Sequence, residues 1–338
     1  MEDNKYHIVH TESSGGWGGQ EIRTLSEIQE FSRNGHKVTL ICDNHTPMAK
    51  RAIEYGIETV QLPIGKKTFT GLFALRTWFK ANDFDIINTH SSSDSWMVAI
   101  GMRLALKVKP LVRTRHVSAP VSNNYATRWL YHKAANHIVT TGIKLKEALI
   151  KNNNLSADKI TSVPTGINTS LFIPTKDKAA VCQSLELPTD KIIIGIVATL
   201  RSWKGHDYLI KAFHQLDNEN THLLIVGDGP QKENIKQQIS QFDLGHKTTL
   251  AGEQKNVVPW LQSMDIFVLP SYANEGVPQS LMQAMSCGLP VISTDVGSIV
   301  EIVKHEETGL IIDTKNTDSI RHALNRLINE KNTTEKLI

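Results

Sequence analysis

The sequence predicts an α/β protein built from two doubly wound domains that face each other across a cleft. Short apolar runs rich in β-branched residues alternate with longer amphipathic segments, as buried parallel strands alternate with helices. This alternation stops at a stretch with prolines and weak periodicity, and then it starts again. The chain has 338 residues, which is too long for one ordinary core and fits two domains of about 150–170 residues each.

The first half of the chain contains the segments that we expect to form the first sheet. They lie at residues 7–11, 37–42, 59–63, 85–90, 110–115, 137–141 and 159–164. Helical patterns fill most of the gaps, and the pattern that starts at residue 22 ends on Gly35, a residue type that commonly closes a helix. The repeated strand–helix order predicts βαβ units and a parallel sheet.

The second sheet is expected from the apolar runs at residues 191–199, 222–229, 248–252, 265–270, 290–294 and 309–313. Between the two sets, residues 168–190 contain Pro174 and Pro188, which predicts a linker. We therefore expect an N-terminal domain at residues 1–170 and a C-terminal domain at residues 171–338. Doubly wound domains bind ligands outside the carboxyl ends of their strands, so the residues that follow each strand are the first site candidates.

The charge of the chain is divided unevenly between its halves. Residues 1–170 carry 21 Lys and Arg against 14 Asp and Glu, a balance of +7, whereas the remainder carries 16 against 20, a balance of −4. Part of the excess comes from a basic cluster of Arg103, Lys107, Lys109, Arg113 and Arg115. An excess of this kind suits phosphate-rich partners or an anionic membrane surface.

Cysteine usage and the N-terminus indicate a cytoplasmic protein. Cys42, Cys182 and Cys287 form no CxxC pair, so neither a disulfide framework nor a zinc site is expected. Residues 1–10 lack the charged-then-apolar order of a signal peptide, and no apolar run approaches the roughly 20 residues of a spanning helix. Contact with a membrane surface, without a span, is compatible with this pattern.

A glycine-rich loop, ESSGGWGGQE at residues 12–21, follows the first expected strand. Gly18 and Gly19 let the backbone approach a ligand closely, and the next helix offers unpaired N–H groups and a positive dipole end. The loop matches neither GxxxxGK nor GxGxxG, which argues against an NTPase and a dehydrogenase. We expect the loop to bind a diphosphate; the alternative is a flexible turn.

Two cations and two glycines follow strands of the second domain. Arg201 and Lys204 lie on the turn after residues 191–199, where they can neutralise a pyrophosphate. Gly227 and Gly229 mark a close turn after the next strand. We expect these residues to contact one anionic ligand; a solvated pair of cations on a surface loop is the alternative.

The stretch NEGVPQSLMQAM, residues 274–285, places a carboxylate after a buried strand and before a helix. Glu275 is followed by the backbone amides of Gly276 and Val277, and the helix then carries Gln283. A carboxylate beside free amides can hold the hydroxyl groups of a sugar. The alternative for Glu275 is a simple helix cap.

Two histidines follow strands of the first half. A lone histidine is usually structural, and for His90 we weigh that interpretation equally with a functional one. His116 follows two arginines at a strand end, so we expect it to face the cleft.

Two further patterns are expected to be structural. The DFD sequence at Asp83–Asp85 precedes a strand instead of following one, which favours loop and strand-start residues over a metal site. Residues 66–80 mix lysines with aromatic residues, and we favour an ordinary amphipathic core helix over a helix on a membrane surface.

The order of these motifs resembles that of the family 4 retaining glycosyltransferases of GT-B architecture. In the second half the match runs from GDGP through the stretch LAGEQKNVVPWLQSMDIFVLPSYANEGVPQSLMQAMSCGLPVIST. In the first half GGWGGQE, DIINTHSS, TRH, TTGIKLKEAL and VPTGINTSLFIP follow in the family's order. The resemblance covers nearly the whole chain. It implies two Rossmann-like domains, a nucleotide-sugar donor on the C-terminal one, retained configuration, and neither a metal nor another cofactor.

The resemblance also implies individual roles. Glu275 is similar to the first acid of a paired-Glu motif at the donor sugar, and Gln283 stands where the second acid would bind the ribose. Lys204 is similar to a lysine that binds the donor phosphates, and Arg201 lies two residues after Thr199, which occupies the usual arginine position. The resemblance places Gly18 and Gly19 at the diphosphate and His116 near the donor sugar.

These observations predict a cytoplasmic enzyme that moves a hexose or related sugar from a UDP- or GDP-linked donor to a glycan or lipid-linked acceptor, as in polysaccharide or lipopolysaccharide biosynthesis. The acceptor is expected at the first domain, whose positive charge suits peripheral contact with an anionic membrane, and no nucleic acid is expected. One alternative is a non-catalytic nucleotide-sugar-binding subunit, because Gln283 and Thr199 replace charged residues and the chain ends before the family's usual closing helix. The other alternative is an epimerase on the same two-domain plan.

Overall fold

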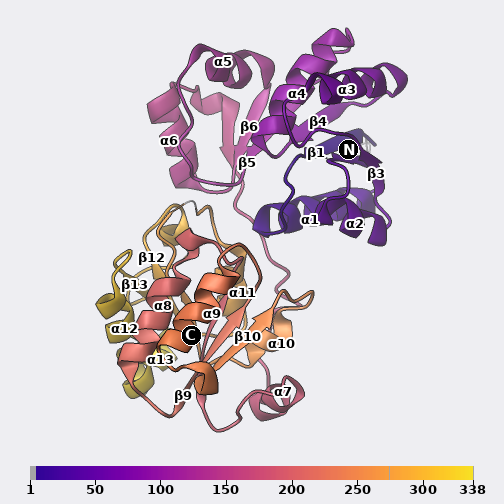
Figure 1. Cartoon of the computed structure of the whole chain (residues 1–338). Helices are drawn as coiled ribbons and strands as arrows, with labels where there is room; N and C mark the ends of the chain where they lie inside the picture. The colour runs from indigo at the N-terminus through magenta and orange to yellow at the C-terminus, as the bar shows by residue number, and fades with distance from the viewer. Residues whose placement is uncertain (1–4, 274, 338) are drawn as a thin grey trace. The chain divides into compact units, whose positions relative to one another are not determined.

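The computed structural model describes residues 5–273 and 275–337 and divides into two compact units, Met1–Pro164 and Thr165–Ile338 (Figure 1). Each unit is an α/β structure with one parallel sheet, so the two doubly wound domains predicted from the sequence are confirmed. Among the described residues, no helix has both the length and the apolar character that a membrane span requires.

The first unit has a seven-stranded sheet with the order β3-β2-β1-β4-β5-β6-β7. Its strands are β1 (His7–Glu12), β2 (Lys37–Cys42), β3 (Glu58–Gln61), β4 (Ile86–Thr89), β5 (Leu111–Arg115), β6 (His137–Thr140) and β7 (Ile160–Ser162). Its helices are α1 (Gly19–Arg33), α2 (Pro47–Glu54), α3 (Phe69–Ala81), α4 (Ser92–Leu104), α5 (Tyr125–Arg128) and α6 (Ile143–Asn153). As predicted, Gly35 closes α1, with a φ of +83° that suits glycine.

The second unit has a six-stranded sheet with the order β10-β9-β8-β11-β12-β13. Its strands are β8 (Ile192–Val197), β9 (Thr221–Val226), β10 (Thr248–Gly252), β11 (Ile266–Leu269), β12 (Val291–Thr294) and β13 (Leu310–Ile312). Its helices are α7 (Lys178–Ser184), α8 (His206–Leu216), α9 (Lys232–Gln241), α10 (Val258–Gln262), α11 (Gln279–Ser286), α12 (Thr317–Asn329) and α13 (Lys331–Lys336). A 3₁₀ turn at Ser202–Lys204 precedes α8.

The inner strands of the second sheet are continuous apolar runs because they are covered on both faces, whereas the edge strand β10 is partly exposed. In β9, for example, all residues are buried. The three cysteines are buried and free. Burial raises the pKa of Cys42 to about 12 and that of Cys287 to about 11, so these thiols stay protonated and pack as small apolar groups.

The stretch expected as a linker packs as part of the second unit. Phe172, Cys182 and Leu187 are buried in its core. The hydroxyl of Ser286 donates to the carbonyl oxygen of Phe172 at 2.6 Å, which fixes the stretch to α11. Its apolar residues are few and irregularly spaced, so periodicity did not indicate that they pack.

In both sheets the strand order reverses beside the first strand. β1 pairs with β2 on one side and β4 on the other. β8 pairs with β9 on one side and β11 on the other. At such a reversal the two connections leave toward opposite faces, so the adjacent strand ends border a crevice. The loops after β1 and β4, and those after β8 and β11, contain most of the predicted site residues.

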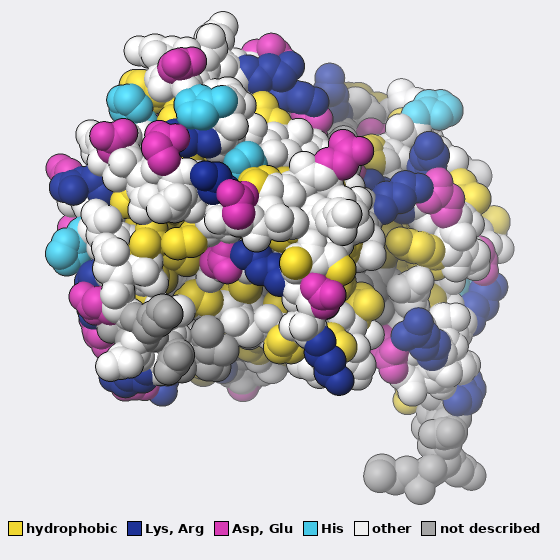
Figure 2. Space-filling view, turned by 90° about the horizontal axis from the view of Figure 1, so that it is seen from below, with side chains coloured by type: hydrophobic (Ala, Val, Ile, Leu, Met, Phe, Trp, Pro, Cys, Tyr) yellow, Lys and Arg dark blue, Asp and Glu magenta, His cyan; other side chains and the backbone are white. Residues whose placement is uncertain are grey.

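The basic residues that cluster in the sequence at 103–115 do not form one surface. Arg113 is buried, whereas Lys107 and Lys109 both pair with Asp83, at 3.2 and 3.3 Å. Arg103 donates to the carbonyl oxygen of Ala99. The five residues belong to different parts of the chain: Arg103 lies on α4, Lys107 and Lys109 lie in the loop that follows, and Arg113 and Arg115 lie in β5. On the face drawn in Figure 2, Lys and Arg side chains are likewise interspersed with Asp and Glu.

Candidate functional site

The site candidate of the second unit is centred on an ion pair between Lys204 and Glu275. Lys204 ends the 3₁₀ turn after β8, and Glu275 lies in the loop after β11, the neighbouring strand. Nζ of Lys204 lies 2.7 Å from Oε1 of Glu275. The side chain of Lys204 is 18% exposed and that of Glu275 is 6% exposed. The structure therefore brings together the two residues that the sequence assigned to a phosphate and to a sugar.

Backbone contacts fix the two loops to each other. The backbone N–H of Tyr272 donates to the carbonyl oxygen of Trp203 at 2.8 Å. Gly205 has a φ of +77°, and a Cβ there would lie 2.2 Å from the carbonyl oxygen of Pro270. Only glycine allows this approach, so Gly205 sets the distance between the loop that carries Lys204 and the loop that carries Glu275.

Gly297 supports Glu275 from the loop after β12. It has a φ of +60°, and a Cβ there would lie 2.0 Å from the carbonyl oxygen of Glu275. The sequence interpretation missed Gly297. One signal in the sequence could have indicated Gly297. It lies in DVGS, shortly after an apolar strand, at the same edge of the sheet as the other candidates.

Arg201 and Lys204 differ in their availability to a ligand. Arg201 is exposed, with its guanidinium 5.5 Å from the Trp203 ring, and among the described residues it has no acidic partner. His206 adds no charge to this turn. Burial, followed by the charge of Lys204, lowers its pKa to about 3, so it is neutral. Arg201 and Lys204 are therefore the cations of this turn.

The start of α11 offers backbone donors beside Glu275. Pro278 precedes the helix, and no side chain caps it. Within the described part of the chain, the N–H groups of Gly276 and Val277 have no hydrogen-bond acceptor. Gln283 lies in the second turn of α11 and is partly exposed. These donors are free to meet a ligand, which is consistent with the prediction for them but does not test it.

The fold itself requires glycine at positions 227 and 229. A Cβ on Gly227 would lie 2.0 Å from the carbonyl oxygen of Ala198, and one on Gly229 would lie 2.8 Å from that of Leu200. The turn therefore presses against the end of β8. Beside it lies a cavity of about 170 Å³, which the sequence did not predict, lined by Leu200, Gly227, Lys232, Ile235, Lys236, Leu250, Ala251 and Gly252.

The glycine loop of the first unit is held by the buried carboxylate of Glu12. Glu12 accepts hydrogen bonds from the backbone N–H of Ser14 at 2.8 Å, from Nε2 of Gln20 at 2.6 Å and from the hydroxyl of Ser91 at 2.5 Å. These bonds join the ends of β1 and β4 to the start of α1. In the sequence Glu12 is only the first residue of the loop, and its local context did not indicate this role.

The predicted glycines lie where α1 begins. Gly19 is the first residue of the helix, Gly18 precedes it in extended conformation, and no side chain caps this end. A Cβ on Gly19 would meet no atom within 4 Å, so the fold itself does not require glycine there. Close approach of a ligand remains the predicted reason for Gly19.

Two acids beneath this loop have raised pKa values. Burial, followed by the charges of Asp94 and Glu21, raises the pKa of Glu12 to about 7. Burial also raises the pKa of Asp94 to about 6. Asp94 accepts from the hydroxyl of Thr11 and from the backbone N–H of His90, which ties β1 to the start of α4. This part of the site therefore carries less negative charge than its carboxyl groups suggest.

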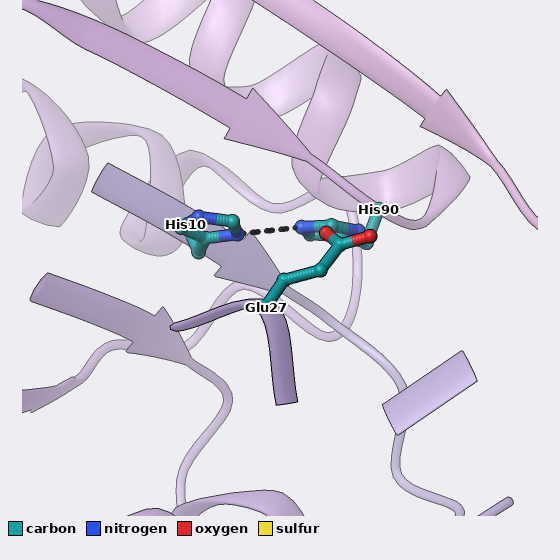
Figure 3. Close-up of side chains that lie close together, drawn as sticks. All are labelled: His10, Glu27 and His90. Atoms are coloured by element: carbon teal, nitrogen blue, oxygen red, sulfur yellow. Dashed lines mark hydrogen bonds between the residues drawn. The ribbon is translucent and has the colours of Figure 1, made fainter. Parts of the chain in front are cut away.

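His116 and His90 belong to a row of three histidines. Nε2 of His116 lies 2.9 Å from Nδ1 of His90, and Nε2 of His90 lies 2.9 Å from Nδ1 of His10. Glu27 on α1 lies beside His10 and His90 (Figure 3). The sequence singled out the two residues at the strand ends but missed His10, which is the fourth residue of a buried strand and has no loop context.

The DFD residues are structural, as predicted. Oδ2 of Asp85 accepts from the backbone N–H of His7 at 2.7 Å. Asp83 pairs with Lys107 and Lys109 at the edge of the sheet where the strands begin.

Two family profiles match the chain and together span most of it. The profile described as "Glycosyltransferase Family 4" matches residues 17–171, and that described as "Glycosyl transferases group 1" matches residues 177–338. The UDP-Gal:alpha-D-GlcNAc-diphosphoundecaprenol alpha-1,3-galactosyltransferase of Escherichia coli is 26% identical, over 97% of this chain and 89% of its own. The D-inositol 3-phosphate glycosyltransferase of Corynebacterium aurimucosum is 24% identical, over 94% of this chain and 84% of its own.

Solved structures of similar fold cover nearly the whole chain. Anabaena Alr3699/HepE in complex with UDP-glucose has a TM-score of 0.87 at 19% identity, over 98% of this chain and 92% of that one. The lipopolysaccharide outer core galactosyltransferase WaaB has a TM-score of 0.69 at 18% identity, over 96% and 90%. At these identities the likeness concerns the fold.

The Lys204–Glu275 pair gives a prediction about stability. Lys204→Ala leaves the buried Glu275 without its partner, so we expect a loss on the order of 1–3 kcal/mol, which is less than for a fully buried pair because Lys204 is partly exposed. The double variant Lys204→Ala/Glu275→Gln should recover most of this loss. Urea unfolding measures both. Lys232→Ala, which removes a more exposed pair with Asp228, is the control and should change little. Equal losses in the single and double variants would contradict the assignment.

The raised pKa of Glu12 predicts how stability depends on pH. Between its usual value near 4.5 and about 7, the carboxyl group keeps its proton in the folded chain and loses it in the unfolded chain. Stability from this group therefore falls as the pH rises through that window. We expect Glu12→Gln to gain on the order of 1–3 kcal/mol relative to wild type between pH 5 and pH 8. Melting temperatures across that range test this, with the exposed Glu147→Gln as control. A constant difference would refute it.

Proposed function

The chain belongs to the family 4 glycosyltransferases of GT-B architecture, and on this premise we propose that it transfers a hexose from a UDP-linked donor to a lipid-linked glycan acceptor. Transfer from a nucleotide sugar with retained configuration is the reaction of the family. The proposal of UDP draws on the Escherichia coli relative, named for UDP-Gal, and on HepE, solved with UDP-glucose. The proposal of a lipid-linked acceptor draws on the name of the Escherichia coli relative, which includes a sugar linked to diphosphoundecaprenol.

The single observation that carries the proposed site is the contact between Lys204 and Glu275. One donor molecule presents a diphosphate next to its sugar ring, so the cation and the carboxylate that bind these parts must be neighbours. An ammonium group has three hydrogens to donate. Lys204 can therefore keep its bond to Glu275 while it donates to a phosphate oxygen, and Glu275 keeps its other oxygen for a sugar hydroxyl.

Stabilisation of the leaving group follows from the same geometry. As the bond between the sugar and the diphosphate breaks, negative charge grows on the diphosphate. Lys204 and the exposed Arg201 supply fixed positive charge to it, and fixed charges of this kind are the largest single contribution in many enzymes. We assign the free N–H groups of Gly276 and Val277 to the sugar and the outer phosphate, beside the start of α11.

We assign the remaining predicted residues to the binding of other parts of the nucleotide sugar. We assign the amides of Gly18 and Gly19 to the diphosphate and His116 to the sugar. The cavity of about 170 Å³ beside Gly227 has apolar walls from Leu250 and Ile235, which suits the flat face of a base. Gln283 is assigned to the ribose, since an amide can both accept from and donate to hydroxyl groups.

We also propose that the first unit contacts the cytoplasmic surface of an anionic membrane. Phe69 and Phe73 in the first half of α3 are 82% and 57% exposed, and Lys66 and Lys67 precede them. The second half of α3 packs in the core through Phe79 and its neighbours, so the helix is part core and part exposed aromatic surface. Exposed aromatics beside lysines suit a lipid headgroup region, where a lipid-linked acceptor lies.

The donor assignment predicts both binding and turnover. UDP should raise the melting temperature more than GDP at equal concentration, and UDP-hexose should be hydrolysed or transferred. We expect Lys204→Ala to lower turnover by more than about 10²-fold, the scale for losing one preorganised electrostatic partner. Lys247→Ala, which removes an ion pair with Glu219 before the start of β10 and away from the proposed donor site, should keep most activity. Stabilisation by UDP without any turnover would favour a non-catalytic binding subunit, and conversion of the donor without acceptor would favour an epimerase.

The membrane assignment predicts a loss of vesicle binding. The double variant Phe69→Ser/Phe73→Ser should bind vesicles containing phosphatidylglycerol at least about tenfold more weakly, because each buried Phe contributes roughly 1.5–3 kcal/mol. Co-sedimentation measures this. Ile53→Ser on α2, where the side chain is 56% exposed, is the matched control. Binding that is unchanged in the α3 variant, or equally lost in the control, would refute the assignment.

A further inference from the structure

The row of three histidines lies at the reversal of the first sheet. His10 comes from β1, His90 follows β4 and His116 follows β5. Neighbouring rings lie 5.2 Å apart between centroids, and each pair shares a hydrogen bond of 2.9 Å. His10 and His90 are fully buried, whereas His116 is partly exposed. His116 is therefore the end of the row that a ligand can reach.

The row permits only two arrangements of protons. A neutral imidazole carries one N–H and one lone pair. His90 uses both nitrogens in hydrogen bonds, so it donates through one and accepts through the other. Both hydrogen bonds must then point the same way along the row. Either every ring donates toward His116, or every ring donates toward His10.

The buried end of the row selects between them. Nε2 of His10 has no hydrogen-bond partner within the described part of the chain. A buried N–H without an acceptor is rarer than a buried acceptor without a donor, so Nε2 of His10 carries the lone pair and Nδ1 carries the proton. His10 then donates to His90, and His90 donates through Nδ1 to Nε2 of His116.

We propose that His90, supported by His10, is a positioning residue that holds His116 as a neutral ring with its N–H on Nδ1. In this form His116 turns a fixed hydrogen-bond donor outward and cannot act as a base through that atom. The inference rests on the proposed function in one respect: the N–H on Nδ1 of His116 donates to a hydroxyl group of the sugar that is transferred.

The surroundings keep the row neutral. Burial lowers the pKa of His90 and of His116 well below the usual range. Arg23 from α1 and the arginines of β5, Arg113 and Arg115, face the row and lower the pKa of His116 further. The acid from α1, Glu27, forms an ion pair with Arg23 at 2.6 Å. Asp94 from α4 accepts the backbone N–H of His90 and not its ring.

Two other functions fit the row less well. His10, Glu27 and His90 present ligand atoms within 4.8 Å of one another, as in a metal site. The facing nitrogens of the two histidines, however, share a hydrogen bond (Figure 3). The carboxylate of Glu27 pairs with Arg23. A proton relay would need an exit at His10, where Nε2 has no partner among the described residues. The row is therefore suited to holding a ring in place.

Nitrogen NMR of the full-length protein with ¹⁵N-labelled histidine tests the inference directly at pH 7. The signal lost in His116→Gln identifies His116, and we expect it to report an N–H on Nδ1 and a bare Nε2. Added Zn²⁺ should leave the signals of His10 and His90 unchanged. An N–H on Nε2 of His116, a charged ring, or zinc-bound His10 and His90 would each overturn the proposal.

Variants of His90 separate positioning from a general structural role. The side-chain amide of Asn reaches the place of Nδ1, so His90→Asn keeps the bond to His116, whereas His90→Leu removes it. We expect His90→Leu to mix the two forms of His116 and to lower kcat about tenfold or more with little change in KM, while His90→Asn retains most of the rate. His7→Asn, at the other end of β1, is the control and should be unaffected. Equal losses in the Leu and Asn variants would count against positioning.

The same experiments distinguish this inference from the proposed function. If His116→Ala keeps full turnover, the assignment of His116 to the sugar is wrong. The NMR experiment still decides which nitrogen of His116 carries the proton, because it does not depend on turnover. If His116→Ala is inactive but the ring carries its proton on Nε2, the proposed function survives and the positioning inference does not.

Discussion

The site depends on one topological constraint, the reversal of strand order beside the first strand of each sheet. In the second unit this reversal makes β8 (Ile192–Val197) and β11 (Ile266–Leu269) neighbours. In the chain, 68 residues lie between the end of β8 and the start of β11. Because both strands are parallel, the loops that follow them leave from the same edge. Lys204 and Glu275 therefore meet, and Gly205 and Gly297 bring the backbones of these loops close enough for the ion pair.

The two units offer different kinds of group to an anionic ligand. The second unit supplies charge, through the exposed Arg201 and through Lys204 in its ion pair. At the reversal of the first unit, burial removes charge instead. Glu12 has a raised pKa, the histidines of the row have lowered ones, and the uncapped start of α1 offers neutral N–H groups. In the first unit, the raised pKa of Glu12 avoids the repulsion that an ionised carboxylate beneath the glycine loop would exert on an anionic ligand.

Several candidate residues could be chosen from the sequence because their signal is local. A glycine-rich turn after a strand indicates Gly18 and Gly19, and a carboxylate between a strand and a helix indicates Glu275. Residues whose role depends on contacts across the sheet gave no such signal. His10 is the fourth residue of a buried strand, Glu12 is the end of the same strand, and Gly297 is one glycine among many. The basic residues at 103–115 are close in sequence but are spread over α4, a loop and β5, so their grouping in the sequence did not indicate one surface.

The sequence by itself determined the two parallel sheets, the strands that form them and the edge of each sheet at which the candidate site residues lie. The spacing of apolar residues and the residue types of turns, which carry this information, are properties of short segments. Tertiary structure alone decided which loops are neighbours, that Lys204 and Glu275 share an ion pair, and that three histidines from three strands form one hydrogen-bonded row. Those outcomes depend on strand order and burial. Both arise from long-range packing, which no short segment encodes.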